Sequence, residues 1–384
     1  MKSVLNNWLV VLLATLLSLA LVEFGALIWV KAVRDHQLSR WEFRATQPLP
    51  YQNADYFSEE FLRESETFVN GRLSDVVQLD DYRGKYFNVA DGFRVTTGSP
   101  LQFKRRILLF GGSTLFGQEV PDEHTIASYL QVMINDAGVA WTVSNYGLPG
   151  MNASQQVSIL KTISLRKGDI VIFYHGVNDV YYVVFGGALD GWKSGVPNFR
   201  PIQELSPLAQ WMKGWHERLK PFSYTADLAL DIFDRSTPST ITNEVVLSQG
   251  VELAAARFRA AVEDAQGFVM RSSAEFEHYL QPTIYDVNQR SKYEQGLVTH
   301  YLETPPGVDI AFAKGYPKLY EVSLELQGEG IPFVDARDAL DKRHDYDEVF
   351  LDFCHLNHIG NWLIAKRIYD ESVLPRFDNA SLDP

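Results

Sequence analysis

The sequence predicts an α/β fold in which helices cover both faces of a central parallel sheet. Apolar, strand-like runs alternate with amphipathic helical segments from about residue 105 onward. The polar residues and glycines of chemical interest follow the ends of these runs, where open α/β sheets bind their ligands. With 384 residues, 46% of them hydrophobic and 22% charged, the chain is long and apolar enough for a sizeable core.

The first element is an apolar stretch from Trp8 to Val30. At about 1.5 Å per residue, a helix of this length crosses a hydrocarbon core of roughly 30 Å. We therefore predict an N-terminal transmembrane anchor over residues 1–33. The alternative is a cleaved signal peptide, with Lys2 as its positive start and small residues such as Ser18 and Ala20 at the cleavage site.

Residues 34–104 form a polar, aromatic-rich accessory segment without long helical periodicity. Within it, residues 88–94 predict a turn and a short strand that pack against the main domain. Arg94 at the end of this stretch is a candidate contact for an anionic substrate, although a structural role is the simpler interpretation.

The main domain is predicted over residues 105–376. Its expected strands are Arg106–Phe110, Trp141–Asn145, Ile170–Tyr174, Phe276–Leu280 and Ile331–Val334. Its expected helices are Ile126–Ala137, Ala153–Leu165, a stripe from Val251 to Ala265, Tyr316–Leu326 and one beginning near Asn357.

An irregular insertion interrupts this domain at about residues 180–249, and it contains Trp192, Trp211 and Trp215. A long connection in a compact domain is typical of a lid or binding loop. We predict a cap whose aromatic side chains line an acyl or sugar pocket, with a packed subdomain away from the site as the alternative. Residues 377–384 are a C-terminal tail.

Charge and cysteine content exclude some functions. The net charge of −13 and pI near 5.2 argue against a nucleic-acid partner, which requires clustered Lys and Arg. The single cysteine, Cys354, excludes an internal disulfide and a zinc site with several cysteines. We interpret Cys354 as a small buried packing residue rather than as a reactive thiol.

Two distant segments carry the chemistry. Ser113 follows an apolar strand and two glycines, while Asp352 precedes His355 by three residues. A nucleophilic hydroxyl needs a base and a third group that orients the base, and these groups need only meet in space. Two further segments, ending in Gly150 and containing Asn178, offer donors for a developing oxyanion. These residues together predict a serine hydrolase.

At these four segments the chain resembles the SGNH hydrolase superfamily, also called the GDSL esterase/lipase family, over about residues 106–373. The resemblance implies a three-layer, flavodoxin-like fold. It also implies a nucleophile at Ser113, oxyanion donors at Ser113, Gly150 and Asn178, and a base and its carboxylate at His355 and Asp352. It implies no cofactor and no metal. Gly112 replaces the aspartate of the Gly-Asp-Ser-Leu signature.

Other functions remain open at this point. An O-acetyltransferase would use the same triad, and a scaffold or ligand-binding protein would keep the fold without turnover. Asp352, Cys354, His355 and His358 also lie close enough in sequence to bind zinc, but no distant pair of ligands supports such a site.

The residues do not identify the substrate, and the side of the membrane on which the catalytic domain lies has to be inferred. Lys31, Arg34, Arg40 and Arg44 outnumber Lys2 and the amino terminus, which alone favours a cytoplasmic catalytic domain. Anchored proteins of the family that the chain resembles often face outward, so we expect an extracytoplasmic domain, in a bacterial periplasm or at the cell surface. The expected substrate is a small-molecule, glycan or lipid ester, with an O-acylated envelope glycan preferred.

Overall fold

The computed structural model describes residues 2–29, 44, 47, 49–69, 79–185, 241–300, 307–341 and 348–377. The chain divides into two compact units, one made of residues 1–43 and 200–239 and the other of residues 44–199 and 240–384. In the first unit the structure describes a single helix, α1 (Lys2–Trp29). The residues of the predicted cap between 186 and 240, including its tryptophans, and most of the C-terminal tail lie outside the described residues.

The predicted transmembrane anchor is not supported. Within the described ranges, no helix has the combination of length and apolar character that is needed to cross a membrane.

A five-stranded parallel sheet forms the centre of the second unit, in the order β5-β4-β6-β7-β8. Its strands are β4 (Arg105–Gly111), β5 (Trp141–Gly147), β6 (Ile170–His175), β7 (Glu275–Leu280) and β8 (Phe333–Asp335). Numbered along the chain, this order is 2-1-3-4-5, the arrangement of flavodoxin-like sheets. The predicted α/β class with a parallel sheet is confirmed.

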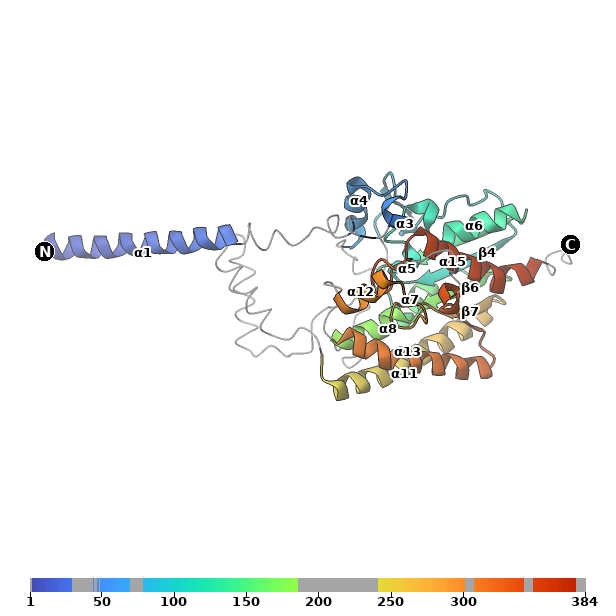
Figure 1. Ribbon diagram of the computed structural model, residues 1–384. Coiled ribbons are helices and arrows are strands. Elements are labelled where there is room, and N and C mark those ends of the chain that lie inside the picture. The colour runs from blue at the N-terminus through green and yellow to red at the C-terminus, as the bar shows by residue number, and fades with distance from the viewer. Residues whose placement is uncertain are drawn as a thin grey trace. The chain divides into compact units, whose positions relative to one another are not determined.

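Helices cover both faces of the sheet (Figure 1). Leu108 and Phe110 of β4 pack into the core under α7, α8, α11 and α13, whereas Ile107 and Leu109 pack into the core under α6, α12, α14 and α15. This alternation follows from the period of two along a strand. Fully buried strands need apolar residues on both faces, which explains the continuous apolar run of β4.

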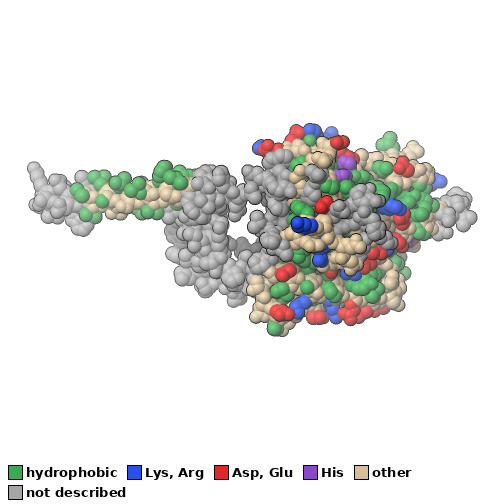
Figure 2. Space-filling model, viewed as in Figure 1, with side chains coloured by type: hydrophobic (Ala, Val, Ile, Leu, Met, Phe, Trp, Pro, Cys, Tyr) green, Lys and Arg blue, Asp and Glu red, His purple; other side chains and the backbone are tan. Residues whose placement is uncertain are grey.

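The helices of the second unit are bounded as follows: α3 (Leu49–Gln52), α4 (Glu59–Val69), α5 (Ser113–Phe116), α6 (Ile126–Asp136), α7 (Ala153–Leu160), α8 (Val177–Tyr181), α11 (Glu244–Met270), α12 (Lys292–His300), α13 (Val308–Gly328), α14 (Asp338–Asp341) and α15 (His358–Ile368). Shorter 3-10 and π turns are η2 (Asp122–His124), η3 (Tyr182–Phe185), η4 (Tyr369–Val373) and η5 (Leu374–Arg376). Acidic and basic side chains are interspersed over α11 and α13 (Figure 2), where Lys314 lies 3.0 Å from Glu244.

Several predicted boundaries differ from the structure, and α11 begins at Glu244 instead of Val251. The last strand begins at Phe333 instead of Ile331, because Pro332 has no N–H to donate to a ladder. The helix predicted from Tyr316 begins at Val308 and continues through Pro317, a residue that usually marks the first turn of a helix. The helix predicted to reach Leu165 ends at Leu160.

The accessory segment contributes a small antiparallel sheet to the second unit. It consists of β1 (Tyr82–Arg83), β2 (Asn88–Ala90) and β3 (Phe93–Arg94), in that order. The predicted turn lies between β2 and β3, where Asp91 and Gly92 adopt positive φ angles of 54° and 83°.

Candidate active site

The register of the sheet brings the predicted site residues to one edge. Gly111 at the end of β4 lies opposite Gly147 of β5 and Tyr174 of β6. The chain segments that continue from these three positions carry Ser113, Gly150 and Asn178. A Cβ at Gly111 would lie 2.7 Å from the Tyr174 carbonyl oxygen, so the turn from β4 into α5 requires glycine at that position.

Buried side chains hold the short helix α5 that begins at Ser113. The Nε2 atom of Gln281, which follows β7, donates to the Thr114 hydroxyl at 2.9 Å. Asn145 of β5 donates to the Leu115 carbonyl oxygen at 2.9 Å, and its own amide oxygen accepts from the Gly147 N–H. Because each partner belongs to the sheet or follows it directly, the orientation of Ser113 is fixed relative to the sheet.

The loop that carries His355 is closed on itself. Phe350 and Leu356 form an antiparallel bridge, and the Leu351 N–H donates to the His355 carbonyl oxygen at 2.9 Å. Asp352 Oδ1 accepts the N–H groups of Cys354 and His355 at 2.9 and 2.6 Å. These two backbone hydrogen bonds fix the orientation of the Asp352 carboxylate independently of its side-chain partners.

Ser113, His355 and Asp352 form a continuous hydrogen-bonded chain. Ser113 Oγ lies 2.7 Å from His355 Nε2, and His355 Nδ1 lies 2.6 Å from Asp352 Oδ2. Since an ionised carboxylate only accepts hydrogen bonds, Nδ1 carries the hydrogen and Nε2 accepts from the serine hydroxyl. The structure therefore brings together three residues that are separated by up to 242 positions.

Electrostatics favour the charged form of both histidine and aspartate. Burial alone would lower the pKa of His355, but the Asp352 carboxylate and its hydrogen bond outweigh burial, so the pKa of His355 lies above its ordinary value. Burial alone would raise the pKa of Asp352, yet His355, followed by the Arg44 guanidinium, holds that pKa well below its ordinary value. The site thus stabilises an imidazolium beside a carboxylate.

One of the predicted oxyanion residues, Asn178, lies beside the backbone that leads into Ser113. An ideal Cβ placed on Gly112 would lie 2.6 Å from Asn178 Nδ2, so the side-chain amide of Asn178 sits directly against the backbone that precedes the serine. The same nitrogen donates to the Met151 carbonyl oxygen at 2.8 Å. Glycine at 112, the departure from the Gly-Asp-Ser-Leu signature, is what gives Asn178 this space.

Helix α8 and the turn after it hold the loop at Gly150. Gly150 has a φ of +77°, which glycine adopts without strain, and its carbonyl oxygen accepts from the Tyr182 hydroxyl at 2.6 Å. Asp179 Oδ1 accepts from the Ala153 N–H at 3.1 Å. Burial raises the pKa of Asp179 to about 6, although the bond from Ala153 acts in the opposite direction.

The zinc interpretation is not supported by the geometry. Asp352, Cys354 and His355 place one ligand atom each within 4.8 Å of one another, but both ring nitrogens of His355 are already engaged. His358 Nδ1 lies 3.3 Å from the Tyr56 hydroxyl instead. Burial, with the nearby Asp352 charge, raises the pKa of the Cys354 thiol well above its ordinary value, so Cys354 stays protonated and packs in the core.

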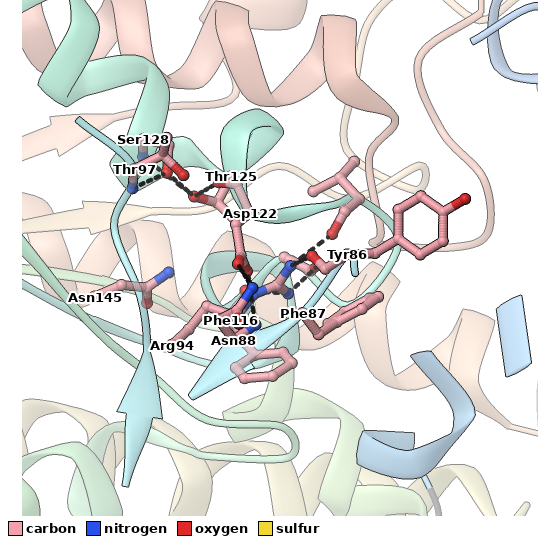
Figure 3. Close-up of polar contacts among 12 residues, drawn as sticks. Tyr86, Phe87, Asn88, Arg94, Thr97, Phe116, Asp122, Thr125, Ser128 and Asn145 are labelled. Atoms are coloured by element: carbon pink, nitrogen blue, oxygen red, sulfur yellow. Dashed lines mark hydrogen bonds and ion pairs between the residues drawn. The ribbon is translucent and has the colours of Figure 1, made fainter. Parts of the chain in front are cut away.

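Arg94 is unavailable to a substrate. Its guanidinium is buried and pairs with Asp122 (Figure 3). It also donates to the carbonyl oxygens of Gly117 and Val120. The hypothesis of an anionic-substrate contact is therefore wrong, because the buried guanidinium is engaged by Asp122 and by backbone carbonyl oxygens around it. His175, at the end of β6, is 1% exposed, and its Nε2 lies 3.4 Å from Nδ1 of His278.

Sequence patterns did not point to two charged residues near the site, Arg44, which contacts Asp352, and Glu119, which pairs with Arg44. Arg44 NH2 lies 3.2 Å from Asp352 Oδ2 and 2.9 Å from Glu119 Oε1. Glu119 lies six positions after Ser113 in the sequence. This short separation suggests that Glu119 lies near the serine, but it indicates no role for the carboxylate. Arg44 belongs to the accessory segment, and no motif marks it.

Comparisons with known proteins were made by family, by curated sequence and by structure. No family model matches the chain, and no curated protein does so. Similar solved structures include a member of the lipolytic protein G-D-S-L family from Veillonella parvula, with 12% identity, 71% of this chain and 100% of that chain covered, and a TM-score of 0.38. The lipase/acylhydrolase from Enterococcus faecalis has 16% identity, coverage of 70% and 96%, and a TM-score of 0.36.

A catalytic mutant of an acetylxylan esterase from Geobacillus stearothermophilus has 12% identity, coverage of 72% and 95%, and a TM-score of 0.37. The similar structures thus include the family that the four sequence blocks resemble. At these TM-scores the likeness does not bear on activity, which has to be argued from the geometry of the site.

Proposed function

We propose that this protein is a serine hydrolase of the SGNH/GDSL type that cleaves acyl or acetyl esters. The observation that supports this most strongly is the chain of two short hydrogen bonds from Ser113 through His355 to Asp352, at 2.7 and 2.6 Å. Each of these residues lies in a segment whose backbone is fixed by other bonds, so the arrangement is preorganised rather than a chance contact of surface groups.

In the proposed reaction the Ser113 hydroxyl attacks the ester carbonyl carbon while His355 Nε2 accepts its proton. The carbonyl π electrons move to oxygen and form a tetrahedral oxyanion. The oxyanion collapses, the alcohol leaves with the proton from His355, and an acyl-Ser113 ester remains. Water, activated by His355, then attacks this ester and releases the acid. Asp352 holds the imidazole in the tautomer that accepts from serine and stabilises the imidazolium.

The oxyanion would be held by the backbone N–H groups of Ser113 and Gly150 and by the side chain of Asn178. The amide nitrogen of Asn178 carries two hydrogens, and Met151 accepts one of them. The other hydrogen serves the oxyanion in this proposal. A preorganised donor of this kind contributes about 10²–10³ to kcat.

The proposed substrate is an ester with an apolar or ring-shaped group beside the carbonyl. Phe353, between Asp352 and His355, stacks on Tyr181 at 5.3 Å between ring centroids with an interplanar angle of 13°. Both rings are partly buried. Such a pair offers a flat apolar surface to an acyl chain or to the face of a sugar. O-acylated glycans and lipids both meet this description.

Turnover of p-nitrophenyl acetate tests the proposal. We expect the Ser113→Ala variant to lose turnover while its unfolding curve stays close to that of the wild type. Ser154→Ala, an exposed serine at the start of α7, is the matched control and should retain full activity. Equal turnover by the wild type and Ser113→Ala would refute the assigned nucleophile. p-Nitrophenyl esters of increasing chain length and acetylated glycans then separate the two substrate classes.

A further inference from the structure

The carboxylate of Asp352 receives a hydrogen bond that the triad does not supply. Oδ1 accepts two backbone N–H groups, and Oδ2 accepts both His355 Nδ1 and, at 3.2 Å, Arg44 NH2. Arg44 precedes Ser113 by 69 positions and comes from the accessory segment. A residue from outside the predicted catalytic domain therefore completes the set of hydrogen bonds to the carboxylate.

The Arg44 guanidinium is held from several sides. NH1 donates to the Leu351 carbonyl oxygen at 2.7 Å, directly before Asp352 in the chain, and NH2 donates to Glu119 Oε1 at 2.9 Å. Gln47 Nε2 also donates to the Leu351 carbonyl oxygen at 3.2 Å, and the Tyr293 hydroxyl donates to Gln47 Oε1 at 2.6 Å. Arg44 thus spans the backbone and the side chain of the triad loop.

Glu119 is held by Arg44 and by a loop that Arg94 fixes. It lies in the loop that follows α5, and Arg94 donates to the carbonyl oxygens of Gly117 and Val120 on either side of it, at 2.9 Å each. Both Arg44 and Glu119 are only 2% exposed. Two charges that are removed from water at this depth are costly, and such a pair is weak evidence for stability by itself. The contact of Arg44 with Asp352 gives the pair a specific role.

We propose that Arg44 and Glu119 act as a pair of positioning residues for the triad. Arg44 fixes Asp352 in the orientation in which Oδ2 accepts from His355, and Glu119 balances the positive charge so that the imidazolium can still form. This inference rests on the proposed function, because a positioning role requires that His355 and Asp352 act in turnover.

Among the residues that the structure describes, the titratable and charged groups near His355 come from four segments. Asp352 and Cys354 belong to its own loop, Glu119 to the loop after α5, and Arg44 to the accessory segment. Tyr293 of α12 faces Asp352 and Arg44. The effects of the pair on His355 are opposite in sign, since the glutamate favours the imidazolium and the guanidinium disfavours it.

The test is the pH profile of kcat/KM for p-nitrophenyl acetate in the full-length chain. We expect Arg44→Met to lower kcat about tenfold or more with little change in KM, as for loss of one hydrogen bond to a charged group. The fall of kcat/KM at low pH, which we call the acid limb and which follows protonation of His355, should move to higher pH. Glu119→Gln should move the acid limb to lower pH. In the double variant the limb should return toward its wild-type position, because both charges are absent.

Arg44→Lys separates charge from geometry. Lysine keeps the positive charge but lacks the planar fork that spans Leu351 and Glu119, so the acid limb should stay near the wild-type pH while kcat falls. The matched control is Arg106→Met. Arg106 pairs with the buried Asp169 near the amino end of β4, roughly 20 Å along the strand from the site, and should leave the limb in place.

The outcomes distinguish the two proposals. If the wild type turns over no faster than Ser113→Ala, the proposed function fails, and this inference fails with it. If the wild type is active but the acid limb keeps its position in every folded variant of Arg44 and Glu119, the pair is structural and the inference alone is overturned. The same conclusion follows if Arg106→Met moves the limb as far. If Arg44→Met does not fold, the acid limbs of Glu119→Gln and Arg44→Lys decide whether the pair positions the triad.

Discussion

Gly112→Ala should reduce turnover through Asn178 alone. In the structure, a Cβ at position 112 would lie 2.6 Å from Asn178 Nδ2, whereas the next atom, the Met151 carbonyl oxygen, would lie at 3.5 Å, an ordinary contact. The backbone of Gly112, with φ −87° and ψ −154°, is open to any residue. The substitution therefore adds one clash, with the side chain that is proposed to bind the oxyanion.

The size of the effect follows from that clash. Ordinary contacts begin at 3.4 Å, so the amide must retreat by about 0.8 Å, a large part of the narrow distance range of a good hydrogen bond. Complete loss of one oxyanion donor costs about 10²–10³ in kcat. We expect a partial loss, about tenfold or more in kcat, with KM nearly unchanged, because the amide acts on charge that develops in the transition state.

A double-variant cycle, with p-nitrophenyl acetate as the substrate, checks whether Gly112→Ala acts through Asn178. Asn178→Ala should lower kcat by the full amount, and Gly112→Ala should have little further effect in that background. Gly328→Ala is the matched control, since a Cβ there meets no atom within 4 Å. An equal loss from Gly112→Ala with and without Asn178 would refute the reasoning, since the substitution would then act elsewhere.

Three further predictions concern charge. First, kcat/KM should fall as the pH decreases through the pKa of His355, because the imidazolium cannot accept the serine proton, and this fall should lie above the ordinary value of 6.5; a midpoint below 6.5 would contradict the raised pKa. Second, burial lowers the pKa of His278 from 6.5 to about 3. The folded state then binds fewer protons than the unfolded state between these values, so stability is lost as the pH falls below 6.5, by about 2 kcal/mol at pH 5; urea unfolding of His278→Phe should show a correspondingly shallower decline, and parallel curves would exclude this group. Third, Arg94→Met should lower the free energy of unfolding by about 3–5 kcal/mol, because it leaves Asp122 as an unpaired buried charge; a loss below 1 kcal/mol would contradict the buried pairing.

The sheet, and the edge of it at which the candidate site residues gather, could be predicted from the sequence because both depend on local patterns. Runs such as residues 106–110 are apolar at every position, which is typical of a strand that is covered on both faces. The residues after such runs must gather at one edge once the strands are parallel. The residues of the proposed triad were predicted from residue type and order, and the structure brings Ser113, His355 and Asp352 into hydrogen-bonding distance.

The features that sequence patterns did not reveal depend on long-range packing. Arg44 reaches Asp352 across 308 positions, and an arginine among other polar residues has no periodicity that would distinguish it. Arg94 seemed available to a substrate because neighbouring polarity does not disclose burial. Because proline usually marks the first turn of a helix, Pro317 obscured the earlier start of α13 at Val308. The contacts of Val308, Ala311 and Phe312 in the core compensate for the helical hydrogen bond that Pro317 cannot make.

The central claim is that Ser113 is an activated nucleophile. Its most direct test is covalent labelling of the full-length protein with a fluorophosphonate, followed by intact-mass measurement and peptide mapping. We predict one adduct per chain, located on Ser113, and slower labelling in His355→Ala. An unlabelled protein, under conditions in which a known serine esterase reacts, or an adduct on another serine would contradict the claim.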